Sequence, residues 1–277
     1  MKLLTSIQEL YSDLSVDHWF DLEPWDVHYM NFEPNIIYAA HKIGDVYYAF
    51  SNGRSYLSDF DCENFGQLIS QNDDTHLRYI RSKFLQSALS FYNYAIDLSW
   101  QVIWFYLGDN SFLFMEKPRY YQKYSGFCTF PTLLEVVGLR GREDFRQHLL
   151  AFNNNPLTLE VRQLYNYVKH RGSLYTKNLG EQYNSMMIGY VSGSIEYTPQ
   201  MITRKVFDLD EWKEKLIEFD QLFFLYFEDL IHLILPQNYQ TTQYDFGLSL
   251  NYSRRRLEFI QNDMEDYERR FNEYFSG

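Results

Sequence analysis

The sequence predicts an all-α protein built as an antiparallel helical bundle. Apolar residues recur at alternating spacings of three and four over several long stretches, which is the period of one helix face. The chain has only 7 Pro and 13 Gly in 277 residues, few for an all-β protein with many turns. Its aromatic fraction is 19%, with 25 Tyr and 23 Phe. Long helices packed through aromatic side chains are therefore favoured.

The first part of the chain is expected to elaborate this bundle. A short helix is expected at the N-terminus, and the Trp- and acid-rich segment 17–26 is expected to lie on the core without forming it. The apolar run 35–50 predicts a helix that crosses Gly44. A second helical piece is expected from about Ser55 to Ser70.

The clearest predicted helix begins after a cap at Asp73 or Asp74 and ends at Gly108 to Asn110. Its apolar stripe continues for about eight turns, as expected of a central bundle helix. The stripe is formed by Leu77, Ile80, Phe84, Ala88, Phe91, Ala95, Leu98, Val102 and Phe105.

Shorter elements are expected next. Residues 111–126 are expected to form a tyrosine-rich connection, and short helices are expected at 132–138 and 143–152. After an Asn-rich turn, Thr158 can cap a helix that runs to about Tyr175.

The segment 185–207 has a different pattern, in which apolar residues alternate on both sides of Ser192-Gly193-Ser194. This pattern predicts a small hairpin or extended excursion from the bundle.

A second long helix is expected to begin with a capping box at Asp208 and Glu211 and to end at Pro236. In the last stretch the helical spacing is repeated by Leu257, Ile260, Met264, Tyr267, Phe271 and Tyr274. With no internal repeat or linker, we predict one domain over 1–277. Its parts are an N-terminal elaboration (1–73), a helical core (74–235) and a C-terminal helix (250–277).

The formal net charge of −12 argues against a general nucleic-acid coat protein, because such affinity comes from neutralising phosphates. RNA held at one local basic patch is still compatible with this charge. The candidate patches are Lys169/His170/Arg171, Arg140/Arg142/Arg146 and Arg254/Arg255/Arg256. Taken alone, each patch is more simply explained as a solvated helix face.

Cysteine usage and hydropathy predict a cytoplasmic protein. Cys62 and Cys128 form neither a CxxC pair nor a disulfide framework, which indicates a reducing compartment. The N-terminus lacks the apolar core of a signal peptide. The most apolar windows, 96–107 and 222–235, are short and carry polar and charged residues, so no membrane partner is expected.

The motifs of several common site types are absent from the sequence. Without HExxH or clustered Cys and His, no metal site is expected. Neither GxGxxG nor GxxxxGK[ST] precedes a predicted helix, no GxSxG elbow is present, and no cofactor is expected. Several histidines lie in amphipathic runs and are expected to be structural or at the surface: His41, His76, His148 and His232.

The helix predicted before the hairpin segment carries the strongest candidate site. Arg162, Asn166 and His170 recur every four residues and drift by about 80° in total, so they are expected to share one side of the helix. Lys169 and Arg171 adjoin them. Such a group can neutralise a phosphate and transfer a proton near neutral pH.

The alternative for this helix is purely structural. Cations in a last turn complement the negative end of the helix dipole, and Gly172 is then an ordinary C-terminal cap.

The sequence Asn166-Tyr-Val-Lys-His170-Arg, placed in a helical bundle, resembles the HEPN superfamily (higher eukaryotes and prokaryotes nucleotide-binding). It is similar in particular to the Cthe-type HEPN-like proteins of bacteria. The family motif is an Arg, usually followed by a polar residue such as Asn, and a His four to six residues after the Arg. His170 matches the His and Asn166 the polar residue. Tyr165 stands where the Arg is expected, and Arg162 lies one helical turn before Asn166.

The resemblance covers the predicted helical core and implies a function. Many members of the family are metal-independent RNases of toxin–antitoxin and anti-phage systems, in which two copies form one composite site. Carried over, it implies that Arg162, Asn166 and His170 are catalytic and that Lys169 and Arg171 bind substrate. It also implies a homodimer, an RNA substrate, and an antitoxin or defence-system partner.

Two other functions stay open. The displaced Arg, the net charge and the excess of Tyr also fit an inactive module that dimerises or binds a protein partner. A third reading is a nucleotide or nucleic-acid binder without turnover. An RNase requires a basic cleft around His170, whereas a scaffold would bury that face or leave it flat with acidic residues nearby.

Overall fold

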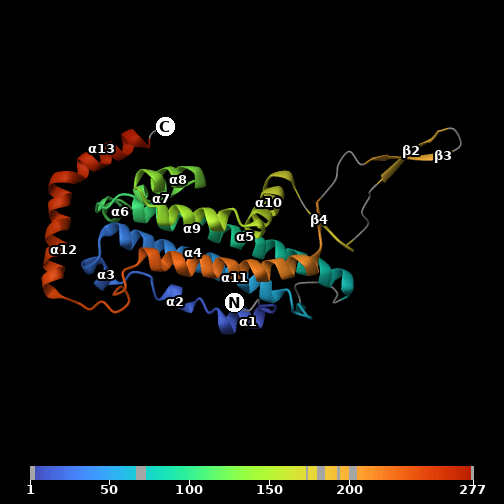
Figure 1. Cartoon of the computed structure of the whole chain (residues 1–277), viewed down its shortest axis with the longest axis horizontal. Coiled ribbons are helices and arrows are strands. Elements are labelled where there is room, and N and C mark those ends of the chain that lie inside the picture. The colour runs from blue at the N-terminus through green and yellow to red at the C-terminus, as the bar shows by residue number, and fades with distance from the viewer. Residues whose placement is uncertain are drawn as a thin grey trace.

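The computed structural model describes residues 4–66, 73–172, 174–179, 185–191, 194–199 and 205–275. Helices make up most of this part of the chain, and the strands are few and short, which confirms the predicted all-α bundle (Figure 1). One continuous cluster of buried apolar residues extends from Leu4 to Phe271.

Three long helices form the body of the molecule: α4 (Pro34–Asp59), α5 (Asp74–Leu107) and α11 (Leu209–Ile234). Helices α4 and α5 are antiparallel. Asn35, at the start of α4, donates to the Tyr106 carbonyl at the end of α5 at 2.7 Å, and Tyr56 near the end of α4 packs on Phe84. Helix α11 is parallel to α5, because Tyr92 contacts Phe219 and the later Ser99 contacts the later Tyr226. It is antiparallel to α4, because Phe50 contacts Phe223 whereas the later Arg54 contacts the earlier Asp220.

Both long predicted helices keep their predicted starts. Asp73 caps α5 by accepting from the His76 amide at 2.9 Å, and Asp208 caps α11 by accepting from the amides of Asp210 and Glu211. The expectation of two separate helices between residues 35 and 70 is wrong, because α4 continues through Gly44 to Asp59. Residues 67–70 of the expected second piece lie outside the described residues.

A buried polar cluster joins the three long helices. The guanidinium of Arg54 on α4 donates to both carboxylate oxygens of Asp220 on α11, at 3.0 and 2.5 Å. The Tyr92 hydroxyl on α5 donates to Asp220 at 2.7 Å. All three side chains are almost fully buried. Removing one partner of such a pair commonly costs about 3–5 kcal/mol, so the cluster fixes how these helices pack.

Glycine is required where α4 meets α5 most closely. A Cβ atom at Gly53 would lie 2.9 Å from the Tyr92 ring, closer than side-chain packing allows. The absence of a side chain at Gly53 therefore lets Tyr92 reach the buried polar cluster.

The N-terminal segment forms three short helices: α1 (Ile7–Asp13), α2 (Asp17–Phe20) and α3 (Asp26–Asn31). The expectation that segment 17–26 stays outside the core is wrong for Trp19, which is fully buried. Its ring stacks on Phe224 of α11 with a centroid distance of 5.6 Å, and it also contacts Phe50 of α4. The acidic neighbours stay outside while the large indole supplies buried apolar area.

Four helices connect α5 to helix α10 (Pro156–Arg171), which carries the candidate site: α6 (Leu113–Glu116), α7 (Pro118–Gly126), α8 (Phe130–Leu139) and α9 (Glu143–Asn153). The last two confirm the short helices that were predicted. The tyrosine-rich connection expected over 111–126 is largely helical. Pro118 suits the start of α7, where its missing amide hydrogen leaves no broken helical bond.

Two small strand pairs follow α10. β1 (Tyr175–Thr176) pairs in parallel with β4 (Val206–Phe207), and β2 (Ser185–Val191) pairs antiparallel with β3 (Ser194–Pro199). The second pair confirms the predicted hairpin, which Figure 1 shows beyond the helices.

The predicted C-terminal helix is present and begins at Phe246, before the expected start at residue 250. It consists of α12 (Phe246–Glu258), one π turn (Phe259–Asp263) and α13 (Met264–Tyr274). Arg255 pairs with Glu33 at 2.7 Å, and Arg256 pairs with Glu116, so α12 is held against the segments around α3 and α6.

Candidate functional site at the end of helix α10

Helix α10 (Pro156–Arg171) carries the candidate site that the sequence predicts. Its N-cap is Asn155, whose side chain accepts from the Leu157 amide at 2.9 Å. The prediction that Thr158 caps the helix is wrong, because Thr158 lies inside the first turn and is fully buried. Val161 is also fully buried, as its apolar stripe predicts.

Gly172 sets the other end of α10. Its φ of +105° is a backbone conformation that side-chain-bearing residues rarely adopt. The helix therefore ends at Arg171, earlier than the expected end near Tyr175. Lys169, His170 and Arg171 form the last turn, and all three are exposed.

Arg162 is directed away from this end of the helix. Its Nη1 donates to Asp97 Oδ1 on α5 at 2.9 Å, and its guanidinium lies 4.5 Å from the Trp100 ring centre. The drift of about 80° between positions 162 and 170 is enough to turn Arg162 to the α5 flank. Arg162 thus fastens α10 to α5.

A surface cavity of about 500 Å³ borders the same end of α10. It brings together three of the predicted residues, Asn166, His170 and Arg171. Arg162 and Lys169 do not line it, and the Lys169 ammonium lies 5.9 Å from the Tyr165 ring centre instead. Three of the five predicted site residues therefore lie at the cavity, and Arg162 and Lys169 lie outside it.

Lys205 enters the cavity from a distant part of the chain. Its amide donates to the Tyr167 hydroxyl at 3.1 Å, and its carbonyl accepts from the Tyr175 amide at 2.9 Å. The β1–β4 pairing therefore holds Lys205 beside α10. Sequence reasoning missed this residue, because no local pattern links it to the motif helix.

The cavity is basic. Among the residues that the structure describes, no carboxylate forms an ion pair with His170, Arg171 or Lys205. The other two predicted basic patches each contain paired cations, such as Arg142 with Asp144 at 2.6 Å and Arg255 with Glu33. The patch at α10 thus has its positive charge available to an anion.

Tyr165, which stands where the HEPN motif would place an Arg, faces α5. Its ring lies edge-on to Tyr94, with centroids 6.0 Å apart. Burial raises the pKa of Tyr165 to about 12, and a hydrogen bond with Tyr94 adds to this shift. The residue is therefore neutral at pH 7 and cannot replace the charge of an Arg.

Other histidines have structural contacts, as expected. His148 bonds to the Tyr226 carbonyl at 2.8 Å, and His232 bonds to the Glu228 carbonyl of its own helix at 2.8 Å. His76 contacts its capping residue Asp73. His41 is different, since it lines a second cavity.

Comparison with protein-family models, curated proteins and solved structures finds no match for this chain. No described helix combines the length and apolarity needed to cross a bilayer. Within the described residues, no group of three or more His, Cys, Asp and Glu side chains is arranged to hold a metal ion.

Proposed function

We propose that this protein is a HEPN-like, metal-independent endoribonuclease of the cytosol that works as a homodimer in a toxin–antitoxin or anti-phage system. The observation that supports the proposal most directly is the basic cavity at the end of α10, where Asn166, His170 and Arg171 lie together. An RNA phosphate needs an accessible cation, and proton transfer needs an exposed imidazole. The motif resemblance supplies the reaction class.

In the proposed reaction a ribose 2′-OH loses its proton to His170 and attacks the adjacent phosphorus. The new P–O2′ bond forms as the P–O5′ bond breaks, which leaves a 2′,3′-cyclic phosphate. The departing 5′ oxygen takes a proton from the second His170, contributed by the partner copy. No metal or redox step is needed for this balance.

The cations have distinct proposed roles. Arg162 is engaged by Asp97 and Trp100, so we assign phosphate binding to Arg171 and Lys205, with Lys169 as a flanking cation. Asn166 lies one turn before His170 and is assigned to orienting the phosphate or the imidazole. Charge-assisted bonds from Arg to phosphate are among the stronger hydrogen bonds available.

The test is RNA cleavage by purified protein in buffer with chelator. Wild type is expected to cleave single-stranded RNA, and substrate with 2′-deoxyribose at the scissile site is expected to resist. His170→Ala is expected to slow cleavage about 10²–10⁴-fold. His232→Ala, which changes an exposed histidine on α11, is expected to leave the rate unchanged. Equal cleavage by both variants contradicts the proposal. In cells, induced wild type should slow growth and fragment total RNA, and His170→Ala should not.

A non-catalytic module that binds RNA or a protein partner is the second candidate. It is favoured by the Arg162–Asp97 pair, which withholds the Arg nearest to the family pattern. This alternative predicts salt-sensitive RNA binding or self-association that Arg171→Ala weakens, with intact RNA after prolonged incubation.

A further inference from the structure

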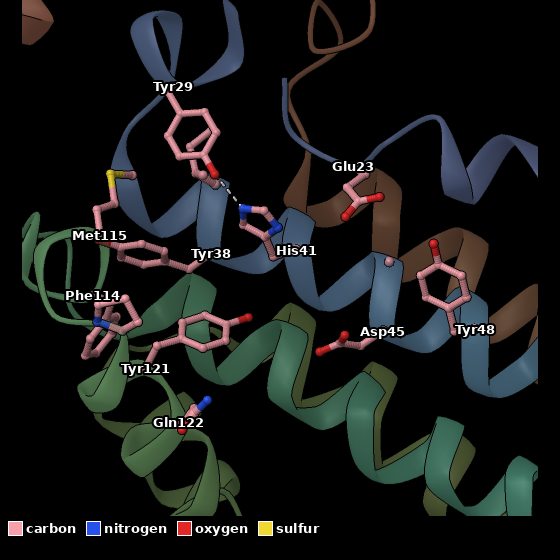
Figure 2. Close-up of a pocket in the computed structure, with 13 residues that line it drawn as sticks. Glu23, Tyr29, Tyr38, His41, Asp45, Tyr48, Phe114, Met115, Tyr121 and Gln122 are labelled. Carbon is pink, nitrogen blue, oxygen red and sulfur yellow. Dashed lines mark hydrogen bonds between the residues drawn. The ribbon is translucent and has the colours of Figure 1, made fainter. Parts of the chain in front are cut away.

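A second cavity, of about 340 Å³, lies between the first half of α4, helix α3 with the segment before it, and helices α6 and α7 (Figure 2). Its walls are rich in aromatic rings: Tyr29, Tyr38, Tyr48, Phe114 and Tyr121. Figure 1 shows α6 and α7 toward the end of the bundle away from β4. This cavity is therefore separate from the one at α10.

Two carboxylates share this aromatic cavity. Glu23 is half-buried, and within the described chain its side chain has no hydrogen-bond or ion-pair partner. Asp45 accepts from Lys42 through Oδ2 at 2.7 Å, while no described donor reaches Oδ1. Figure 2 shows Glu23 and Asp45 on the same side of His41, from two different segments.

The cations near this cavity do not cancel both carboxylates. Lys42 is buried, pairs with Asp45, and lies 5.1 Å from the Tyr121 ring centre. His41 bonds to the Tyr29 hydroxyl at 2.7 Å, and burial lowers the pKa of its imidazole, which keeps it neutral at pH 7. The negative charge of Glu23 therefore remains uncompensated.

Gly44 keeps space open under Glu23. A Cβ atom built there would meet only the Glu23 carboxyl carbon, at 4.0 Å. A glycine inside a long helix costs about 1 kcal/mol relative to alanine, so another reason for it is expected. Keeping space open beneath the half-buried carboxylate of Glu23 is such a reason.

We propose that this cavity binds the ammonium group of a slender aliphatic amine. The faces of aromatic rings attract cations, and a carboxylate without a partner inside a partly desolvated cavity adds a directed acceptor. The apolar walls suit a methylene chain, whereas an anion would meet Glu23 and Asp45. A free diamine or polyamine and the lysine side chain of a partner protein share this chemistry. The inference does not depend on the proposed RNase function.

Calorimetric titration of the full-length protein tests it with four probes. These are putrescine, spermidine, the lysine surrogate Nα-acetyl-lysine methylamide, and the neutral control butane-1,4-diol. At least one ammonium probe is expected to bind with one-to-one stoichiometry and at least ten times more tightly than the diol. Tighter binding of the free amines identifies a small-molecule site, and tighter binding of the lysine surrogate identifies a site for a partner's side chain.

Matched variants connect the binding to this cavity. Glu23→Gln is expected to weaken ammonium binding at least tenfold, and Glu135→Gln, an exposed acid on α8 with the same charge change, is expected to leave it unchanged. Tyr48→Phe keeps the aromatic ring and is expected to keep the affinity for the ammonium probe. Tyr48→Ala removes the ring and is expected to lower that affinity. The proposal is overturned if no ammonium probe binds, if the diol binds equally well, or if Glu135→Gln weakens binding as much as Glu23→Gln.

Discussion

The cavity at the end of α10 and the cavity beside α4 have opposite electrostatic character although they belong to one acidic chain. The cavity at the end of α10 is lined by His170, Arg171 and Lys205, and no described carboxylate pairs with them. The cavity beside α4 has aromatic walls and the unpaired carboxylate of Glu23. A net charge of −12 predicts neither cavity.

The difference shows that local pairing decides what a surface can bind. Arg162 lies on the same helix as His170, yet its charge is used by Asp97 and Trp100. The charge of Lys42 is likewise paired with Asp45. The groups left without partners are cationic at one cavity and anionic at the other, and they are the basis of the ligand proposed for each.

The largest expected effect separates the two cavities by function. His170→Ala is expected to lower the rate of RNA cleavage about 10²–10⁴-fold, because a general acid or base contributes this much, and to leave putrescine binding unchanged. Glu23→Gln is expected to weaken putrescine binding and to leave the rate of RNA cleavage unchanged. Cleavage rates and calorimetric titrations on the same two preparations provide the measurement. Loss of both activities in either variant would mean that the cavities are coupled.

The second effect concerns salt. Arg171→Ala is expected to weaken binding of single-stranded RNA and to reduce the slope of log K against log salt by about 0.7, the value for one lost phosphate contact. Arg254→Ala serves as control, since that Arg is exposed and lies on α12. Fluorescence anisotropy between 50 and 200 mM salt, a range of about fourfold, measures the slopes. Equal slopes for the two variants would count against Arg171 as a phosphate ligand.

The third effect distinguishes Arg162 from Arg171. Arg162→Ala is expected to lower the free energy of unfolding by about 1 kcal/mol, because it removes a partly exposed ion pair and the stacking on Trp100. Arg171→Ala is expected to leave stability unchanged. Urea denaturation followed by circular dichroism compares them. If Arg162→Ala abolishes cleavage without any loss of stability, Arg162 has the catalytic role that the motif resemblance implies.

The fourth effect uses the glycine at the acidic cavity. Gly44→Ala is expected to stabilise the protein by about 1 kcal/mol, since alanine is the better helix former and the added methyl meets only Glu23, at 4.0 Å. It is also expected to weaken ammonium binding by narrowing the cavity. Gly53→Ala is the contrasting variant, and it should destabilise the protein because its Cβ would collide with Tyr92. Thermal unfolding and putrescine titration test both changes.

The long helices could be predicted from the sequence alone. Helical periodicity and the caps at Asp73 and Asp208 located the long helices, because these signals are local. The burial of Trp19 was not predicted. Its sequence neighbours are acidic, and only tertiary packing on Phe224 buries its ring. In the α10 cavity, local spacing found His170 but could not find Lys205, which β-strand pairing brings in.

The acidic cavity was missed altogether, for a related reason. Its residues come from separate segments, and no spacing rule connects Glu23 with Tyr121. His41 was expected to be structural or at the surface. Its hydrogen bond to Tyr29 agrees with a structural role, and its side chain also lines the cavity.

The smallest expected effect is the pH dependence that His41 contributes. Burial, the largest cause, lowers the pKa of His41 below its usual 6.5, with Lys42 lowering it further and Glu23 and Asp45 opposing. The unfolded chain therefore binds a proton more readily than the folded protein. The stability linked to this group is fully present above pH 6.5 and is lost as pH falls from 6.5 through the lower pKa of the folded protein. A His41→Gln variant keeps a hydrogen-bonding group beside Tyr29 and removes the titration. The decrease in melting temperature from about pH 7.5 to about pH 5.5 should be smaller in this variant than in wild type. An equal decrease in the two proteins would show that His41 is not held neutral by its surroundings.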